Sequence, residues 1–131
     1  MIPKYRAWDK IDKEMYLVDE INFNRGEFES IGYGITFLRG ADKVELMQST
    51  GLKDKNGQEI FEGDLVRQVR TQPTTENEIV VGIVTMIEGA WLIMNDSEQL
   101  ASYLWSETDT NEIIGNIYEN PELLEVDHDR Y

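Results

Sequence analysis

Glu62 and Asp64, two carboxylates separated by one glycine, are the residues whose types and spacing come nearest to chemistry in this sequence. Residues two apart on an extended strand share a face. Such a pair could bind Mg²⁺, or could divide the roles of general acid and general base. The protein would then be a carboxylate-based, metal-dependent enzyme, for instance a hydrolase. Exposed acidic residues at the edge of a strand are the commoner explanation of such a pair.

The other nucleophilic or metal-binding side chains fail on position or number. His128 is the only histidine, and it lies in the tail at about 127–131, which is expected to fray. It therefore does not supply the positioned imidazole of a catalytic triad. The chain has no cysteine, which excludes disulfides, thiol catalysis and zinc sites built on cysteine.

The segment 54–57, Asp-Lys-Asn-Gly, resembles the start of a calcium-binding loop but fits a β-turn better. Aligning Gly57 with the invariant glycine of that loop places a leucine and a glycine where acidic ligands belong. Asp is favoured at the first position of a type I turn and Gly at the fourth. The segment therefore predicts a bulged hairpin in which Gly57 is left-handed and Lys53 faces Glu59, whereas a two-residue Asn-Gly loop would set Asp54 against Glu59. We predict no catalytic residue, metal site or cofactor.

The charge of the chain is strongly negative and unevenly distributed. There are 26 acidic and 12 basic side chains, a net charge of −14, and residues 71–131 hold 13 of the acids with one base. This half repels phosphate, which disfavours direct nucleic-acid binding, and a solvated, soluble surface is the simplest explanation. The alternative is an acidic face that mimics DNA or inhibits a nucleic-acid-processing protein. Its candidate partner-binding residues are Glu107, Asp109, Glu112 and Glu119.

Tryptophan is enriched at binding hot spots, so each of the three tryptophans is a candidate anchor for a partner. Trp91 lies inside an apolar run and is expected in the core, and Trp105 is expected in the core or at its rim. Trp8 stands beside Asp9 and a turn-rich segment. Trp8 is therefore the tryptophan for which partial exposure is expected, and it is the aromatic candidate for partner binding.

Short apolar runs separated by turn residues must position these groups, and they predict strands. Lys4–Asp9 and Glu14–Ile21 are predicted to form one hairpin, and Ile79–Ile87 and Ala90–Met94 a second one around Glu88-Gly89. Further strands are predicted at Val44–Gln48, Leu65–Val69 and Glu112–Tyr118, with another candidate at Ile35–Leu38 inside the glycine-rich residues 22–43. In the strand at 79–87, the apolar face predicted to be buried consists of Ile79, Val81, Ile83 and Ile87.

Turn and cap residues predict the connections. Gly63 is expected to mark a bend or bulge, and the polar residues 71–77 are expected to form a loop or a mobile tip within the domain. The cluster Asn95-Asp96-Ser97 favours a helix start, so Glu98–Trp105 predicts one or two helical turns. Asn120 is expected to cap another turn, with Pro121 at its first position.

Three blocks of this sequence closely resemble the YopX family of small phage and prophage proteins. The first block is residues 47–66, with MQSTGLKDKNG at 47–57 and EIFEGDLV at 59–66. The second is YRAWD at residues 5–9, followed by Met15 at the usual methionine of the family, and the third is IGNIYENPELL at residues 114–124. The resemblance spans most of the chain in collinear order. It implies a phage or prophage gene in a bacterial host. It implies no known activity, because the function of the family is unknown, and no catalytic residues carry over.

Length and composition predict a single domain over residues 1–131. The many short strands predict a mainly β fold with little helix, a small partly open barrel or sandwich of short antiparallel strands that is SH3-like in part. Neither a signal peptide nor an apolar run of about 20 residues is found, so no membrane association is expected. We expect a cytoplasmic protein of the bacterial host cell.

The leading functional hypothesis is a noncatalytic phage or prophage accessory protein that binds a macromolecule, most simply a host or phage protein. The absence of a credible active site in the sequence favours binding over catalysis. The partner would meet either an exposed sheet edge or the acidic half of the chain. An exposed edge could also pair two copies, but nothing in the sequence selects a homo-oligomer.

Overall fold

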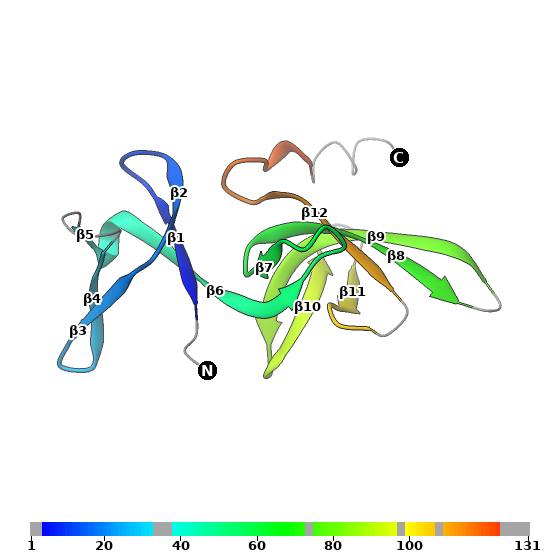
Figure 1. The fold of residues 1–131 in the computed structure, drawn as a ribbon, viewed down its shortest axis with the longest axis horizontal. Helices are drawn as coiled ribbons and strands as arrows, with labels where there is room; N and C mark the ends of the chain where they lie inside the picture. Colours follow the sequence, from blue (N-terminus) through cyan, green and yellow to red (C-terminus); the bar gives the residue numbers. More distant parts are fainter. Residues whose placement is uncertain (1–3, 33–37, 73–74, 97–98, 107–108, 124–131) are drawn as a thin grey trace. The chain divides into compact units, whose positions relative to one another are not determined.

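The computed structural model describes residues 4–32, 38–72, 75–96, 99–106 and 109–123. The chain separates into two compact units, Met1–Ser49 and Thr50–Tyr131. Both consist almost wholly of antiparallel strands, which confirms the mainly β prediction (Figure 1). Strand β6 (Val44–Lys53) begins in the first unit and ends in the second. No helix in the described part of the chain is long and apolar enough to span a membrane.

Some of the predicted features fall on residues outside the described ranges. These are the candidate strand at residues 35–37, the acid Glu107, and the tail that contains His128. Leu38, the last residue of the candidate strand, is the first residue of β5.

The first unit contains the predicted N-terminal hairpin, in which Arg6 pairs with Leu17 and Asp9 with Glu14. The other edge of β1 pairs with the first half of β6. The residues that gave no clear period form a second sheet with strand order β3-β4-β5. The elements are β1 (Tyr5–Asp9), β2 (Glu14–Leu17), β3 (Glu20–Asn24), β4 (Glu27–Gly32), β5 (Leu38–Gly40) and the short 3₁₀ helix η1 (Ala41–Lys43).

The β3–β4 hairpin closes through Arg25 and Gly26, whose φ angles of 56° and 80° are both left-handed. Two left-handed residues are what a two-residue hairpin loop requires, because its twist then matches that of the strands. The core of this unit is small. It is formed by Ala7, Ile31 and Val44, against which Val18, Ile21, Phe28 and Leu46 pack.

The second unit is a five-stranded antiparallel sheet of order β11-β10-β9-β8-β12 that curls into a half-barrel (Figure 1). Strand β7 pairs instead with β6. The predicted partly open barrel is therefore confirmed in outline. The strands are β7 (Glu59–Phe61), β8 (Asp64–Gln72), β9 (Thr75–Ile87), β10 (Ala90–Asn95), β11 (Leu100–Tyr103) and β12 (Thr110–Asn116).

The hairpin of β8 and β9 is longer than the sequence predicted. Gln72 still pairs with Thr75, so most of the polar residues 71–77 belong to strands, and the prediction of a loop there is wrong. Threonine is a good strand former whether or not its strand is buried. A polar composition is therefore compatible with strand structure in this segment.

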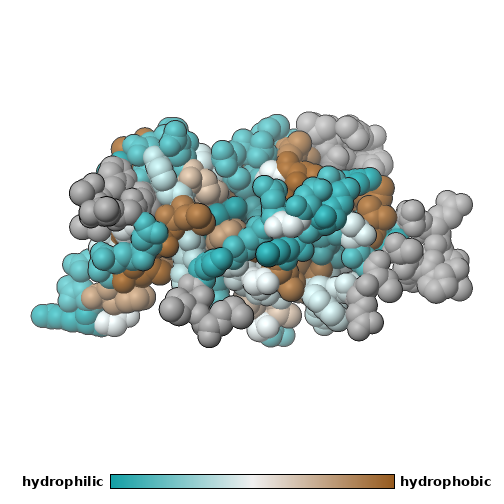
Figure 2. All heavy atoms as spheres, in the orientation of Figure 1, coloured by the Kyte–Doolittle hydropathy of each residue, from teal (hydrophilic) through white to brown (hydrophobic). Residues whose placement is uncertain are grey.

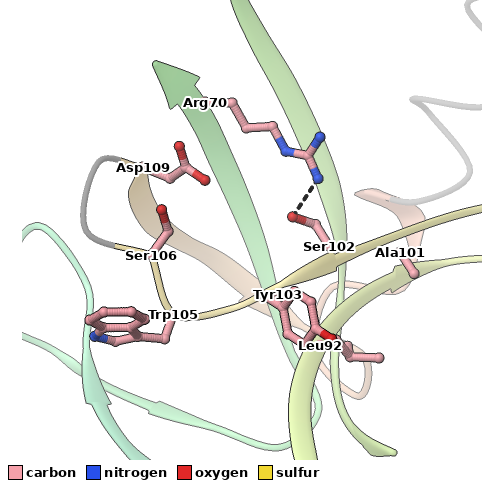
Figure 3. Close-up of a pocket in the computed structure, with 8 residues that line it drawn as sticks. All are labelled: Arg70, Leu92, Ala101, Ser102, Tyr103, Trp105, Ser106 and Asp109. Carbon is pink, nitrogen blue, oxygen red and sulfur yellow. Dashed lines mark hydrogen bonds between the residues drawn. The ribbon is translucent and has the colours of Figure 1, made fainter. Parts of the chain in front are cut away.

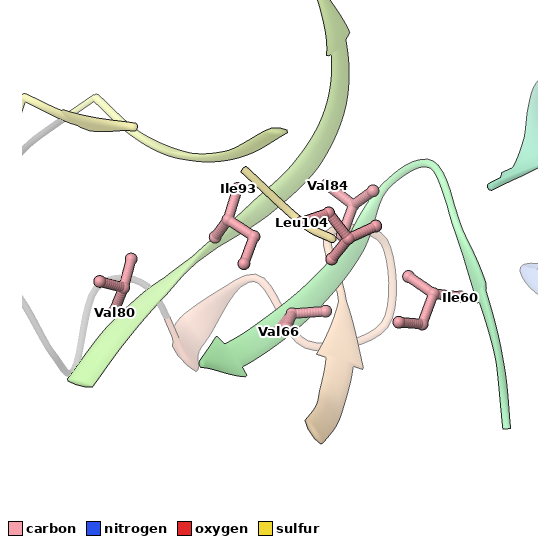
Figure 4. Packing of buried hydrophobic residues seen from close by; sticks show 6 residues of the cluster. All are labelled: Ile60, Val66, Val80, Val84, Ile93 and Leu104. Carbon is pink, nitrogen blue, oxygen red and sulfur yellow. The ribbon is translucent and has the colours of Figure 1, made fainter. Parts of the chain in front are cut away.

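The buried face of β9 is the opposite of the predicted one. Val80 and Val84 are 3% and 1% exposed, whereas Ile79 is 51% exposed. The inward face also contains Gly82, where a Cβ atom would lie 2.5 Å from the carbonyl oxygen of Met94. The inward curl of the sheet therefore needs a glycine on the inner face, and the apolar residues 79, 81, 83 and 87 face outward. The core consists of Ile60, Val66, Val80, Val84, Ile93 and Leu104 (Figure 4).

Glu98–Trp105 does not form helical turns, because its described part contains strand β11. Met94 pairs with Ala101, and the amide of Leu104 donates to the carbonyl oxygen of Trp91 at 3.0 Å. A tight turn precedes the strand, with Gln99 left-handed at φ 54° and its amide bonded to the carbonyl of Asp96. Asp96 of the cap-like polar cluster therefore lies in a turn, and turn residues share their chemistry with helix caps.

Candidate functional site

The block at residues 5–9 holds a turn through a buried carboxylate. Oδ1 of Asp9 accepts the amides of Ile11 and Asp12 at 2.9 and 2.8 Å, and Oδ2 accepts Nε of Arg39 at 2.8 Å. Burial raises the pKa of Asp9, but the amide of Asp12, the Arg39 guanidinium and the amide of Ile11 outweigh it and hold that pKa below its usual value. Asp9 therefore secures the β1–β2 connection as an anion.

The predicted turn at residues 54–57 is confirmed in type and register. The amide of Gly57 donates to the carbonyl of Asp54 at 3.0 Å, Gly57 is left-handed at φ 83°, and the amide of Asp54 donates to the carbonyl of Gln58. The carboxylate of Asp54 does more than was predicted. Its Oδ1 accepts the amides of Asn56 and Gln58, and its Oδ2 accepts the amide of Ile113 in β12 at 3.0 Å. It thus ties the hairpin to the far edge of the sheet.

The same contacts keep Asp54 in its charged form, although this residue is only 7% exposed. Burial raises its pKa, but the amides of Ile113, Gln58 and Asn56 and the nearby Lys55 lower it further, so its pKa lies below the ordinary value. A carboxylate that accepts several backbone amides is stabilised in its charged form. Because the carboxylate of Asp54 accepts these backbone amides, its role is structural.

Glu62 and Asp64 do not share a face of an extended strand, so the geometry predicted for a carboxylate pair is wrong. Gly63 between them is left-handed at φ 87°, in the turn from β7 to β8. Asp64 is 2% exposed, and its Oδ2 accepts the amide of Phe61 at 2.8 Å. Among the residues that the structure describes, no three His, Asp or Glu side chains gather where they could hold a metal ion.

The block at residues 114–124 forms a second side-chain-capped turn. Oδ1 of Asn116 accepts the amides of Tyr118 and Glu119 at 3.0 and 2.9 Å, and the amide of Asn116 donates to Oδ1 of Asn120. A Cβ atom on Gly115 would lie 2.5 Å from that Oδ1, which explains the glycine. The predicted helical turn does follow Asn120, whose backbone carbonyl accepts the amide of Leu123 at 3.1 Å, but the Oδ1 of Asn120 faces back to Asn116.

The acids predicted to bind a partner have separate settings in the described part of the chain. Glu112 lies 3.5 Å from Nζ of Lys55 and 4.0 Å from Nη1 of Arg67. Glu119 is exposed in the turn that follows β12 and accepts Nδ2 of Asn116 at 2.8 Å. Asp109 instead lines a hollow. Part of the predicted acidic surface is therefore neutralised by neighbouring bases.

Side chains bridge the two edge strands of the curled sheet, β11 and β12. Gln68 of β8 is fully buried; its Nε2 donates to the carbonyl of Tyr103 and to Oδ1 of Asn111, and its Oε1 accepts the hydroxyl of Ser102. Nδ2 of Asn111 donates to the carbonyl of Leu104 at 2.7 Å. We call this connection the seam, because side-chain hydrogen bonds replace a backbone ladder there.

An open hollow of about 610 Å³ lies beside the seam, and we call it the seam hollow (Figure 3). Residues 101–103 all line it, with Arg70 on one side and Trp105, Ser106 and Asp109 on another. Consecutive strand residues point to opposite faces, so a hollow that touches three in a row lies along the strand's edge. A second hollow of about 410 Å³ shares Trp105, Ser106 and Asp109.

Two aromatic side chains at the seam hollow are mostly exposed, Tyr103 at 69% and Trp105 at 61%. Trp8 is partly exposed, as predicted, but Trp105 exposes more of its surface. Trp91 packs against the core, as predicted. On the face seen in Figure 2, hydrophobic residues form separate patches between hydrophilic ones.

The sequence contained the signal for this aromatic pair. With residues 100–105 taken as a strand, Ser102 and Leu104 fall on one face and Tyr103 and Trp105 on the other. Ser102 and Leu104 are indeed buried, at 7% and 0% exposure. The assignment of helical turns to this segment concealed the alternation.

These observations define a small, mainly β protein whose most recognisable sequence blocks form hydrogen-bonded turns, with an aromatic hollow along a sheet edge. The family model described as YopX protein matches residues 4–125. The chain therefore belongs to the YopX family. Solved structures that are similar to it include those of two bacterial proteins. A crystal structure of protein EF1440 from Enterococcus faecalis shares 30% identity, with a TM-score of 0.62, over 95% of this chain and 99% of that one.

The second is the crystal structure of protein yopX from Bacillus subtilis, at 21% identity and a TM-score of 0.63, over 92% of this chain and 96% of that one. No curated protein matches this chain. The two structural likenesses extend over nearly the whole length of each chain, so they include both units.

Proposed function

We propose that this chain is a noncatalytic phage or prophage accessory protein that binds another protein in the bacterial cytoplasm through its seam hollow. One observation carries the proposal: Tyr103 and Trp105 are 69% and 61% exposed beside a hollow that follows the edge of β11. Large aromatic side chains kept in water next to a concavity are typical of binding surfaces.

The structural use of the motif residues supports binding over catalysis. Asp9, Asp54 and Asp64 each accept backbone amides in a turn. Carboxylates held in this way are poor general bases, because their lone pairs are occupied and their charged form is stabilised. None of these three aspartates lines the seam hollow, which carries aromatic groups suited to contact a partner.

Affinity capture from bacterial lysate tests the proposal. The bait is the full chain, compared with the Tyr103→Ala/Trp105→Ala double variant and with Phe23→Ala, which removes an aromatic side chain of similar exposure, 63%, from the first unit. We expect a saturable protein partner that the double variant loses and the Phe23 variant retains. Capture of no saturable partner, or equal capture by all three baits, would contradict the proposal.

An alternative is an acidic mimic of nucleic acid, which draws on the charge of the second unit. Residues 50–131 hold 17 acids and five bases, a net charge of −12. The alternative predicts a DNA-binding partner that is lost when Glu107, Asp109, Glu112 and Glu119 are changed together to their amides. The Tyr103→Ala/Trp105→Ala variant would retain that partner, so the two sets of variants separate the two functions.

A further inference from the structure

We infer that the seam hollow binds an extended, basic segment of a partner protein, which adds to the edge of β11 and places a Lys or Arg side chain between Trp105 and Asp109. This inference rests on the proposed binding function and specifies the chemistry of the partner. Three features of the molecule support it: the backbone of the edge, the side chains of the hollow, and the charge of the second unit.

The backbone of β11 presents hydrogen-bonding groups to the hollow. The amide of Leu104 donates to the carbonyl of Trp91, so Leu104 points its backbone groups at β10. In an antiparallel pair these groups alternate between the two sides of a strand. Tyr103 and Ala101, which pair with Leu92 and Met94, therefore direct their backbone groups away from β10, towards the edge.

One of these outward groups is already used at the seam. The carbonyl of Tyr103 accepts Nε2 of Gln68 at 3.1 Å. The other outward groups, the amide of Tyr103 and both backbone groups of Ala101, are directed towards the hollow. An exposed strand edge of this kind is a template for an added strand. The hollow lies where the added strand would run, because residues 101–103 all line it.

The side chains at one end of the hollow suit a cation. Trp105 exposes 61% of its surface, and the close-up shows Asp109 and Ser106 on the same side of the hollow as the indole (Figure 3). An ammonium or guanidinium group is attracted both to the face of a tryptophan and to a carboxylate. At the other end, Arg70 bonds the hydroxyl of Ser102 at 2.7 Å and pairs with Glu78 at 3.6 Å, which offsets its positive charge.

The charge of the whole second unit favours the same partner. A net charge of −12 over residues 50–131 attracts basic segments and repels acidic ones at long range. An apolar or acidic partner would gain no such attraction. Long-range electrostatics thus select a basic segment, and the Asp109 carboxylate adds a local attraction that Lys53 and Lys55, which line the second hollow, offset in part.

Fluorescence polarisation with synthetic peptides tests the inference. The probe is a labelled peptide about eight residues long, within the range of natural strands, in which Lys alternates with Val. A second peptide replaces every Lys with Glu. A third has the Lys sequence with methylated amides along one edge, which removes the donors needed for strand addition. We expect saturable binding of the first peptide and none of the other two.

Variants of the full chain locate the peptide. Trp105→Ala and Asp109→Asn are each expected to weaken binding about tenfold, the effect of a hot-spot side chain or a charge-assisted contact. Glu88→Gln, in the exposed turn between β9 and β10, removes the same charge as Asp109→Asn. Phe23→Ala again controls for loss of an exposed aromatic side chain. Both controls should bind within about twofold of the parent protein, and circular dichroism verifies that every variant is folded.

Three results would overturn the inference: absence of saturable binding to the Lys peptide, equal binding of the methylated peptide, or equal losses in the Asp109 and Glu88 variants. The last would mean that only the net charge attracts the peptide. Failure of the proposed function is a separate result, because lysate capture does not depend on these probes. A partner captured through Tyr103 and Trp105, together with failed peptide binding, would keep the binding function and reject a basic extended partner.

Discussion

Replacing Asp54 with asparagine is the sharpest test of the structural role assigned to the motif residues. The amide side chain of asparagine keeps only one acceptor, its carbonyl oxygen. This oxygen can accept the amides of Asn56 and Gln58, as Oδ1 of the carboxylate does now. Its NH₂ group would then face the amide of Ile113, which at present donates to Oδ2 at 3.0 Å. The substitution therefore sets donor against donor in the contact that ties the hairpin to β12.

The cost follows from the number and kind of bonds. A hydrogen bond to a charged group contributes about 1.5–3 kcal/mol, and Asp54→Asn removes one of them outright while making the acceptor of the other two neutral. Asp54 is only 7% exposed, so water replaces the lost contact poorly. We expect the free energy of unfolding to fall by about 3 kcal/mol.

Urea unfolding measures this loss. Tryptophan fluorescence in a Trp8→Phe background reports on the second unit, because Trp91 and Trp105 both lie there and Trp91 packs against its core. The midpoint should fall while the m-value stays constant, since the surface exposed on unfolding is unchanged. The matched control is Asp96→Asn, an equal change of charge at an exposed turn residue, which should alter stability by no more than about 0.5 kcal/mol.

The pH dependence adds a second criterion. The folded-state pKa of Asp54 is below the ordinary value of 3.8, so its stabilising contribution is complete above that value and is lost as the pH falls through the folded-state pKa. The difference between parent and Asp54→Asn should therefore be full at neutral pH and narrow below pH 3.8. A neutral-pH difference under about 0.5 kcal/mol, or one that is the same in strong acid, would refute the role assigned to this carboxylate.

Other substitutions test other parts of the fold. Gly82→Ala should cost about 2–3 kcal/mol in urea unfolding, because its Cβ would lie 2.5 Å from the backbone carbonyl of Met94; a neutral effect would contradict the close approach at the curl. Gln68→Leu should cost about 2–4 kcal/mol by leaving buried seam groups without partners, and an unchanged midpoint would show that the seam does not stabilise the half-barrel. Arg39→Gln removes the partner of Asp9 at 2.8 Å and raises the pKa of Asp9, so acid unfolding followed by circular dichroism should begin at a higher pH; the parent profile would count against the pair.

Turn chemistry is what the sequence predicted well. The Asp54–Gly57 turn follows from residue types alone, because Asp and Gly have strong positional preferences that do not depend on distant parts of the chain. The same holds for the hairpin at Glu88-Gly89, whose φ angles of 49° and 82° are both left-handed. The clamp from Asp54 to Ile113 joins residues 59 apart in the sequence, and no local pattern specifies such a contact.

Sheet curvature explains where strand predictions failed. Counting apolar residues in β9 selects the face of Ile79 and Val81, but the inner face of a tightly curled sheet has less room and uses Gly82 between Val80 and Val84. A glycine adds no weight to a hydrophobic pattern, although Gly82 lies on the inner face of this sheet. Binary pattern decides the face of a flat sheet, whereas a curled one is also decided by side-chain volume.

The candidate site could not be predicted because exposure depends on which elements cover a residue. Polar neighbours in the sequence favour exposure of Trp8, but Trp105 is 61% exposed because it follows the edge strand β11. The sequence of this segment also fits helical turns, which concealed the exposure of Trp105. Of the four predicted acids, Asp109 alone lines the hollow in the described chain. The charge pattern therefore indicates the correct half of the protein but not the residues that gather there.

The division between scaffold and surface has a consequence for how function should be sought in this family. The blocks that reveal family membership hold Asp9, Asp54, Asp64 and Asn116 in hydrogen-bonded turns. Substituting them will destabilise the fold, so loss of a biological effect in such variants would report on folding and not on a binding site. Tyr103 and Trp105 are exposed, and their substitution leaves the core and the seam intact. Variants at the hollow are therefore the ones whose loss of effect would identify a function.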